Sequence, residues 1–87
     1  MNKLEKAIKT KIQDYIGFPI AQRTFDTIAN DVAQLMYNNG FNDQWDSKSF
    51  KPVVFNANLR VACDLVTNTF SIAFYDNEAW HTLRISA

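Results

Sequence analysis

The sequence predicts a single α+β domain over residues 1–87, with two N-terminal helices packed on one face of a three-stranded antiparallel β-meander. In the first half of the chain, apolar residues recur at spacings of three and four, which is typical of amphipathic helices. In the second half they alternate with polar residues, which is typical of strands with one covered face. A length of 87 residues, 47% of them hydrophobic, suits one core rather than two.

The first helix is expected over residues 3–16, where a leucine and three isoleucines recur every four residues. Residues four apart lie on the same side of a helix, so they form one apolar stripe. Gly17 and Pro19 follow, and these residue types usually end a helix. The stripe consists of Leu4, Ile8, Ile12 and Ile16.

The second helix is expected within residues 19–38. It could start at Pro19 as the first helical residue or at Thr24 as the N-cap. The earlier start is favoured because the apolar pattern continues back to it. Gly40 is expected to adopt a left-handed backbone just beyond the helix. The apolar stripe consists of Phe25, Ile28, Val32, Leu35 and Met36.

Residues 41–52 show neither the spacing of a helix nor the alternation of a strand, and they are expected to form an ordered loop. Three aromatic residues, Phe41, Trp45 and Phe50, lie there among polar and charged ones. We expect these rings to pin the loop to the body of the domain, because burying an aromatic ring is strongly favourable.

Three strands are expected in the remainder of the chain. Apolar and polar residues alternate over residues 53–64, which predicts one long, half-buried strand. Residues 65–68 and 76–79 have the composition of tight turns, with Asn68 tolerating a left-handed backbone. They separate the long strand from two further strands, at 70–75 and 80–86.

The two turns also predict the register. If they close the hairpins directly, Cys63 faces Phe70, and Phe70 faces Ile85 on the third strand. Both turns then place the apolar residues on one face, whereas a slip of one residue in either would scatter them. The two helices are available to cover that face.

The sequence offers few residues for catalysis, and we expect a protein that is not an enzyme. Its one histidine excludes a two-histidine metal site within the chain, and nothing resembles a glycine-rich phosphate loop. Cys63 and His81 are a nucleophile and a base by type, but the predicted register places them on opposite outer strands. We therefore interpret Cys63 as a small core residue and His81 as a half-wet rim residue. Asp43 and Asp46 could hold a cation only weakly, so no metal or cofactor is expected.

Two surfaces are candidates for partner binding. The outer sheet face would carry Arg60, Tyr75, Trp80 and Arg84, and such residues are enriched in protein interfaces. The same set could stack single-stranded bases, but a net charge of zero argues against a nucleic-acid partner. An ordinary solvated face is the remaining alternative.

The second surface is the first helix, whose lysines lie opposite its isoleucine stripe. It could meet a membrane surface, but a solvated face whose stripe covers the sheet is favoured.

A further candidate contact lies at the start of the meander. Leu65 and Val66 form the tip of the first hairpin, where apolar side chains often make contacts. The 53–64 strand would lie at the edge of the sheet with little to protect it, and such an edge can add a strand from a partner or a second copy.

The stretch from Arg60 to Thr69 resembles the C-terminal region of contractile-tail sheath proteins of bacteriophages. The shared pattern is a helix followed by a strand with Val61, Cys63 and Asp64, then Asn68 and Thr69. The likeness covers roughly residues 18–70, although this chain has an extra loop between helix and strand. The resemblance implies a structural role in a virion through strand exchange between subunits.

Together, these patterns predict a small protein-binding module, with a structural or assembly component as the leading hypothesis. The alternative is a monomeric inhibitor or adaptor that docks the same face on a protein partner. No apolar run approaches the roughly 18 residues of a membrane span, so no membrane role and a cytoplasmic location are expected.

Overall fold

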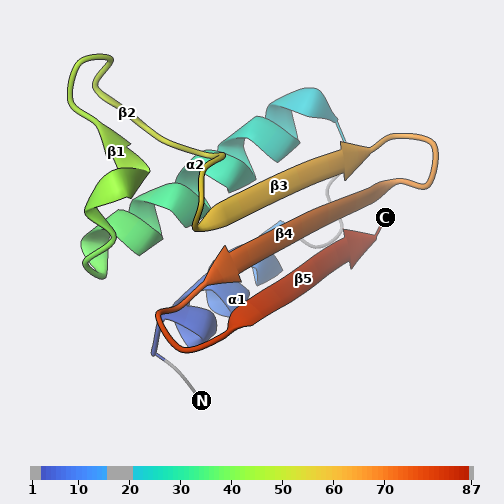
Figure 1. The fold of residues 1–87 in the computed structure, drawn as a ribbon. Coiled ribbons are helices and arrows are strands. Elements are labelled where there is room, and N and C mark those ends of the chain that lie inside the picture. The colour runs from blue at the N-terminus through green and yellow to red at the C-terminus, as the bar shows by residue number, and fades with distance from the viewer. Residues whose placement is uncertain (1–2, 16–20, 87) are drawn as a thin grey trace.

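The computed structural model describes residues 3–15 and 21–86, which form two layers (Figure 1). One layer holds the helices α1 (Lys3–Gln13) and α2 (Gln22–Asn38). The other is a sheet of β3 (Leu59–Asp64), β4 (Thr69–Tyr75) and β5 (Trp80–Ser86), in the order β3-β4-β5. Helix α2 contacts β3 and α1 contacts β5, so the helices cover one face of the sheet. The α+β class is confirmed.

The predicted register of the meander is confirmed. Cys63 pairs with Phe70 and Phe70 pairs with Ile85, and both pairs of strands are antiparallel. The connections are the predicted residues 65–68 and 76–79, because Asp64 faces Thr69 and Tyr75 faces Trp80. Asn68 adopts the expected left-handed backbone, with φ 54°.

The core lies between the two layers. Each element contributes the apolar face that its period predicts, and burying each such side chain contributes about 1.5–3 kcal/mol to folding. Phe25 packs on Phe70 with ring centroids 5.3 Å apart, which joins α2 to the centre of the sheet. The buried apolar residues of this cluster are Leu4, Ile8, Ile12, Ile28, Val32, Ala33, Met36, Phe41, Leu59, Phe70, Ile72, Phe74 and Ile85.

The expected strand over residues 53–64 is wrong in its first half, because β3 begins only at Leu59. Asn56 interrupts the extended chain: its Oδ1 accepts the backbone N–H of Asn58 at 2.8 Å and of Leu59 at 3.1 Å. Its own N–H donates to the carbonyl of Leu59 at 3.0 Å. A short amide side chain that bonds nearby backbone groups offers the chain an alternative to a sheet ladder.

The expected loop over residues 41–52 is also wrong in part. It contains a 3-10 turn, η1 (Asn42–Gln44), and a second, two-stranded sheet of β1 (Trp45–Asp46) and β2 (Lys51–Pro52). Phe41 is buried and Trp45 packs near Tyr37 with ring centroids 5.8 Å apart, as a pinned segment requires. Phe50, however, is 80% exposed and pins nothing.

The helix ends differ slightly from expectation. Helix α1 stops at Gln13, earlier than the expected range 3–16, because Asp14 and Tyr15 form a turn. The predicted stop signal at Gly17 lies outside the described residues. Helix α2 starts at Gln22 with Ala21 as an extended N-cap, so both expected starts are wrong for α2. Thr24 lies inside the helix, and the helix does not run back through Ala21 to the favoured start at Pro19, which itself lies outside the described residues. Gly40 follows α2 with φ 99°, the predicted left-handed backbone.

Candidate functional site

The structure keeps Cys63 and His81 apart. Cys63 lies on β3 and His81 on β5, with β4 between them, and Cys63 pairs with Phe70 whereas His81 pairs with Phe74. Two strand spacings and this offset separate their backbones by about 16 Å. Burial raises the pKa of the Cys63 thiol, with smaller contributions from the nearby carboxylates of Asp64 and Asp26. A thiol with a raised pKa is a poor nucleophile at neutral pH.

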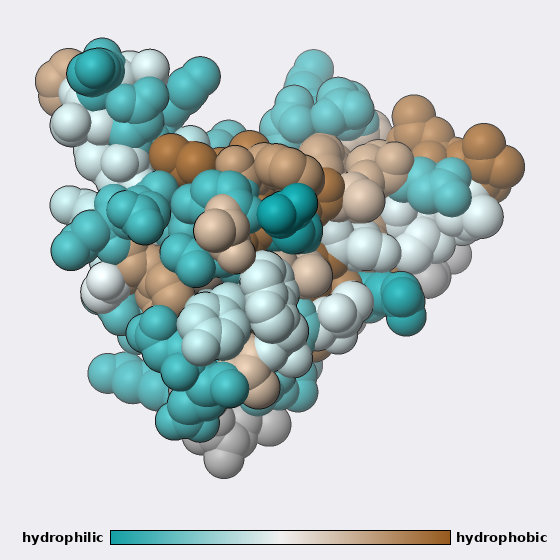
Figure 2. Space-filling model, in the orientation of Figure 1, coloured by the Kyte–Doolittle hydropathy of each residue, from teal (hydrophilic) through white to brown (hydrophobic). Residues whose placement is uncertain are grey.

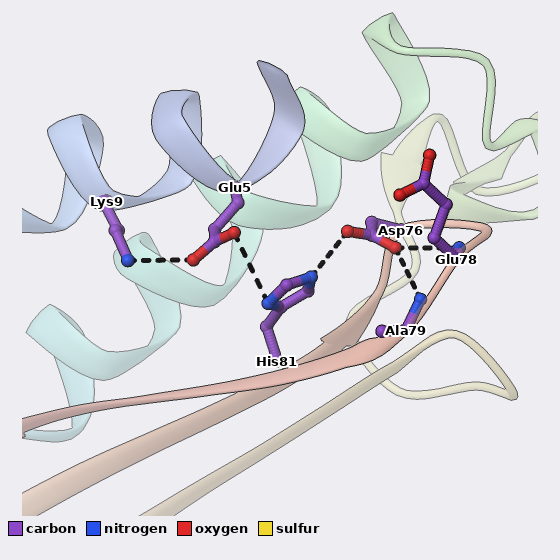
Figure 3. A network of polar contacts seen from close by, with 6 residues as sticks. All are labelled: Glu5, Lys9, Asp76, Glu78, Ala79 and His81. Carbon is purple, nitrogen blue, oxygen red and sulfur yellow. Dashed lines mark hydrogen bonds and ion pairs between the residues drawn. The ribbon is translucent and has the colours of Figure 1, made fainter. Parts of the chain in front are cut away.

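His81 is partly exposed, as expected of a half-wet rim residue, and it is held between two carboxylates (Figure 3). Its Nε2 contacts Asp76 Oδ2 at 2.5 Å, and its Nδ1 lies 3.5 Å from Glu5 Oε2. The ring stacks on Phe74 with centroids 5.2 Å apart, and Glu5 continues the network to Lys9 at 2.8 Å. The network therefore ties α1 to β5 and to the turn before it.

Each carboxylate in this network has a lowered pKa. The backbone N–H groups of Ala79 and Glu78 donate to Asp76 Oδ1, and together with His81 they lower the pKa of that carboxyl. Lys9 is the main cause of the lowered pKa of Glu5, with His81 contributing. The side chains of Glu5, Asp76 and His81 each have a structural partner, and four surface hollows among the described residues are lined by other side chains. We therefore assign the network to stability.

Asp46, one of the two acidic residues singled out from the sequence, has structural partners, and so has Asp31 on α2. Asp46 Oδ1 accepts the backbone N–H of Lys48 at 3.0 Å, and Asp31 accepts the hydroxyl of Tyr15 at 2.7 Å. Within residues 3–15 and 21–86, no group of three or more His, Cys, Asp or Glu side chains could hold a metal ion. No helix in the same ranges is long and apolar enough to cross a membrane.

The outer face of the sheet carries the predicted aromatic pair. Tyr75 and Trp80 face each other across β4 and β5 with ring centroids 5.9 Å apart, and Trp80 is half exposed. Arg84 is exposed two pairs along the same face. Arg60 is already engaged: its guanidinium lies 4.7 Å from the centre of the Phe55 ring, and its Nε donates to the carbonyl of Asn56 at 2.9 Å.

The first hairpin presents two apolar side chains to solvent. Leu65 is 56% exposed and Val66 is 93% exposed, as their predicted place at the tip requires. Asp64 fixes the turn by accepting the backbone N–H of Val66 at 2.9 Å and of Thr67 at 3.3 Å. These hydrogen bonds also lower the pKa of Asp64. The tip is therefore ordered and apolar.

The edge of β3 adjoins this tip. Because the N–H of Tyr75 donates to the carbonyl of Asn58, antiparallel alternation turns the backbone groups of Leu59, Val61 and Cys63 away from β4. The backbone N–H and carbonyl of Leu59 both form hydrogen bonds with Asn56, as described above. Within the part of the chain that the structure describes, Val61 and Cys63 have no strand beside them on this side. They lie between exposed Phe55 and the hairpin tip, and Figure 2 shows brown, apolar surface along this edge.

No family model, curated protein or solved structure matches this chain. The candidate surfaces therefore depend on the geometry alone. Phe55 was not identified from the sequence, because it lies in the segment that was expected to be a strand. The partners of His81 were not identified either, because one of them, Glu5, lies near the opposite end of the chain. The signal for Asp76 was available: an acidic residue opening a four-residue turn usually accepts backbone N–H groups.

Proposed function

We propose that this chain is a non-enzymatic protein-binding module, and specifically a structural or assembly component. Its partner contributes an extended segment that pairs with the outer edge of β3. The observation that carries the proposal is the pair of residues, Val61 and Cys63, whose backbone groups face away from the sheet beside exposed apolar side chains. Unprotected edges of this kind are where proteins add a strand from another chain.

The side chains around the edge support this mode of binding. Val61 and Cys63 point to the covered face of the sheet and are only half-buried, so an added strand would place its alternate side chains next to them. Arg60 and Ala62 are exposed on the outer face and would meet the other set. A segment with apolar side chains on one face and polar ones on the other fits both sets.

The edge alone is short, because only Val61 and Cys63 offer free pairing groups. Two residues provide few hydrogen bonds, and each adds only about 0.5–1.5 kcal/mol net. The rest of the affinity would come from Leu65, Val66 and Phe55, which flank the edge and are exposed. Apolar side chains that become fully covered dominate the energy of most interfaces.

Two alternatives use the outer sheet face instead. An inhibitor or adaptor would dock Trp80, Tyr75 and Arg84 on a protein partner, which the exposed Trp80 favours. A single-stranded nucleic-acid binder would also need Arg60, whose guanidinium is already placed over Phe55. It would lose affinity steeply as salt is raised. The sheath resemblance and the cytoplasmic location stay predictions.

A proline substitution at the edge of β3 distinguishes binding through this edge from binding through the outer sheet face. Val61→Pro removes an outward N–H without removing a hydrogen bond to β4, and Val61→Ala is the matched control that keeps the N–H. Proteins captured by the wild type from cells that make the chain would be lost with Val61→Pro and retained with Val61→Ala. Loss with Trp80→Ala alone would instead support the inhibitor or adaptor. Retention by all three variants would contradict both protein-binding surfaces.

A further inference from the structure

The small β1–β2 sheet forms an arm that projects from the domain (Figure 1). Its strands pair Trp45 with Pro52 and Asp46 with Lys51. The base is well anchored, because buried Gln44 donates from Nε2 to the carbonyl of Val53 at 2.7 Å and accepts from Asn56 Nδ2 at 2.8 Å. The arm is therefore an ordered part of the fold rather than a loose loop.

The end of the arm holds an aromatic ring in solvent. Asp46 fixes the turn by accepting the N–H groups of Lys48 at 3.0 Å and Ser49 at 3.4 Å. Phe50 follows with φ 53°, a left-handed backbone that bulky residues rarely adopt. Its side chain is 80% exposed, so it adds nothing to the core. A strained backbone combined with an exposed aromatic side chain favours a binding role over a structural one.

A groove lies beside the base of the same arm. It has a volume of about 520 Å³, and Figure 2 shows the surface hollowed between the projecting arm and α2, with brown residues on its floor. Phe25 and Ala29 of α2 form one wall, and Val54 lies on the other. The charged side chains that line it are Asp26, Asp46 and Lys51, so acidic residues outnumber basic ones, and Asp26 is exposed.

We propose that Phe50 of one molecule inserts into this groove of a second copy of the chain. The ring would meet the apolar walls, and Lys48, the one charged residue of the turn 47–50, would lie near Asp26. The arm does not fill its own groove, because Phe50 is exposed. The contact joins two different surfaces of the chain. Reciprocal insertion of both arms closes a two-fold dimer, and one-way insertion propagates head to tail into a ring or a filament. It does not use the backbone edge of β3, although Phe55 flanks that edge and also lines the groove. The proposal goes beyond the function proposed above.

The test is the solution mass, measured by light scattering and sedimentation over a range of concentrations. Wild type is expected to grow in mass with concentration. Phe50→Ala removes the inserted ring, and Asp26→Lys, at an exposed position, repels Lys48. Each variant should weaken association about tenfold or more, as loss of an interface anchor does. Mixed together, the two variants should form a 1:1 complex, because one retains an intact groove and the other an intact arm.

Two controls keep the result interpretable. Phe50→Gly suits the left-handed backbone, so it should unfold no earlier than wild type while losing association. Val61→Pro alters the β3 edge and should leave association unchanged, which separates this proposal from the proposed function. Wild type that stays monomeric at every concentration would overturn the proposal. So would Phe50→Ala that associates like wild type, a mixture that forms no complex, or association abolished by Val61→Pro instead.

Discussion

The hydroxyl of Tyr15 donates a hydrogen bond of 2.7 Å to Asp31 Oδ2, which joins the segment after α1 to the middle of α2. Asp31 is also 4.0 Å from Lys11 Nζ. The hydrogen bond to Asp31 is the main cause of the raised pKa of Tyr15, which is about 12, and burial raises this pKa further. The contact holds the two helices of one layer together from outside the apolar core.

Removing this hydrogen bond should destabilise the domain modestly. Tyr15→Phe keeps the ring but deletes the donor, and a hydrogen bond to a charged group contributes about 1.5–3 kcal/mol, less where solvent reaches it. We expect a loss of about 1 kcal/mol in the free energy of unfolding, measured by urea titration. A loss below the error of the titration would show that the contact contributes nothing.

The raised pKa of the Tyr15 hydroxyl predicts that the domain loses stability at high pH. Its pKa is raised to about 12 in the folded state, against about 10 in an unfolded chain. A raised pKa means that the stabilisation is complete below pH 10 and is lost as pH rises towards 12. Ultraviolet titration should show one tyrosine ionising late in the wild type. Tyr15→Phe should remove that late step, and a step that remains would belong to another tyrosine.

Acid should weaken the turn between β4 and β5. The pKa of Asp76 is lowered in the folded state, so its contribution is present above the usual carboxyl pKa of about 4 and is lost as pH falls below it. Asp76→Ala should unfold earlier than wild type at pH 7, and the difference should shrink at low pH. Asp76→Asn keeps an oxygen acceptor and should lie between them. Thermal unfolding at both pH values measures this order.

The contact between Phe70 and Phe25 predicts where the core is least tolerant. Phe70 is buried and central in the sheet, so Phe70→Ala should cost about 3–5 kcal/mol. That is a large share of the 5–15 kcal/mol typical of a domain. Phe55→Ala removes the same ring from an exposed site and should change stability by only about 0.5 kcal/mol. Similar losses at both positions would contradict the assigned core.

The residues with a positive φ angle predict how substitutions at Gly40 and Asn68 change stability. Gly40 has φ 99° with open space where a Cβ would lie, so Gly40→Ala adds backbone strain without a clash. We expect a loss of about 1 kcal/mol. Asn68→Gly, at φ 54°, should be neutral or slightly stabilising, and Asn68→Val should be the worst of the three. Calorimetric midpoints rank the variants, and a stabilising Asn68→Val would contradict the assigned turn.

The sheet could be predicted from the sequence because two independent constraints agree there. Side-chain alternation fixes which face is covered, and the turn lengths fix which residues pair. The strand boundary at Leu59 could not, because Asn56 occupies an outward position in the alternation and looks like any polar surface residue. Only its hydrogen bonds to Asn58 and Leu59 show that it ends the extended chain.

The arm and the His81 network were missed for other reasons. Strands of two residues, such as Trp45–Asp46, have no period to detect, and the burial of Gln44 depends on partners that follow later in the chain. Glu5 comes from the first helix and meets His81 on the last strand. Such contacts depend on how the two layers are aligned, which local patterns do not specify.

The packing of α1 against β5 also has a consequence for synthesis. The first helix of the chain rests on its last strand, through Glu5 and His81 and through the core shared by Leu4 and Ile85. A nascent chain can pack α1 on α2 and form the hairpin of β3 and β4 early, but α1 cannot complete its packing until Ile85 has left the ribosome. Until then part of its apolar stripe is exposed, and exposed apolar surface on a growing polypeptide favours chaperone binding.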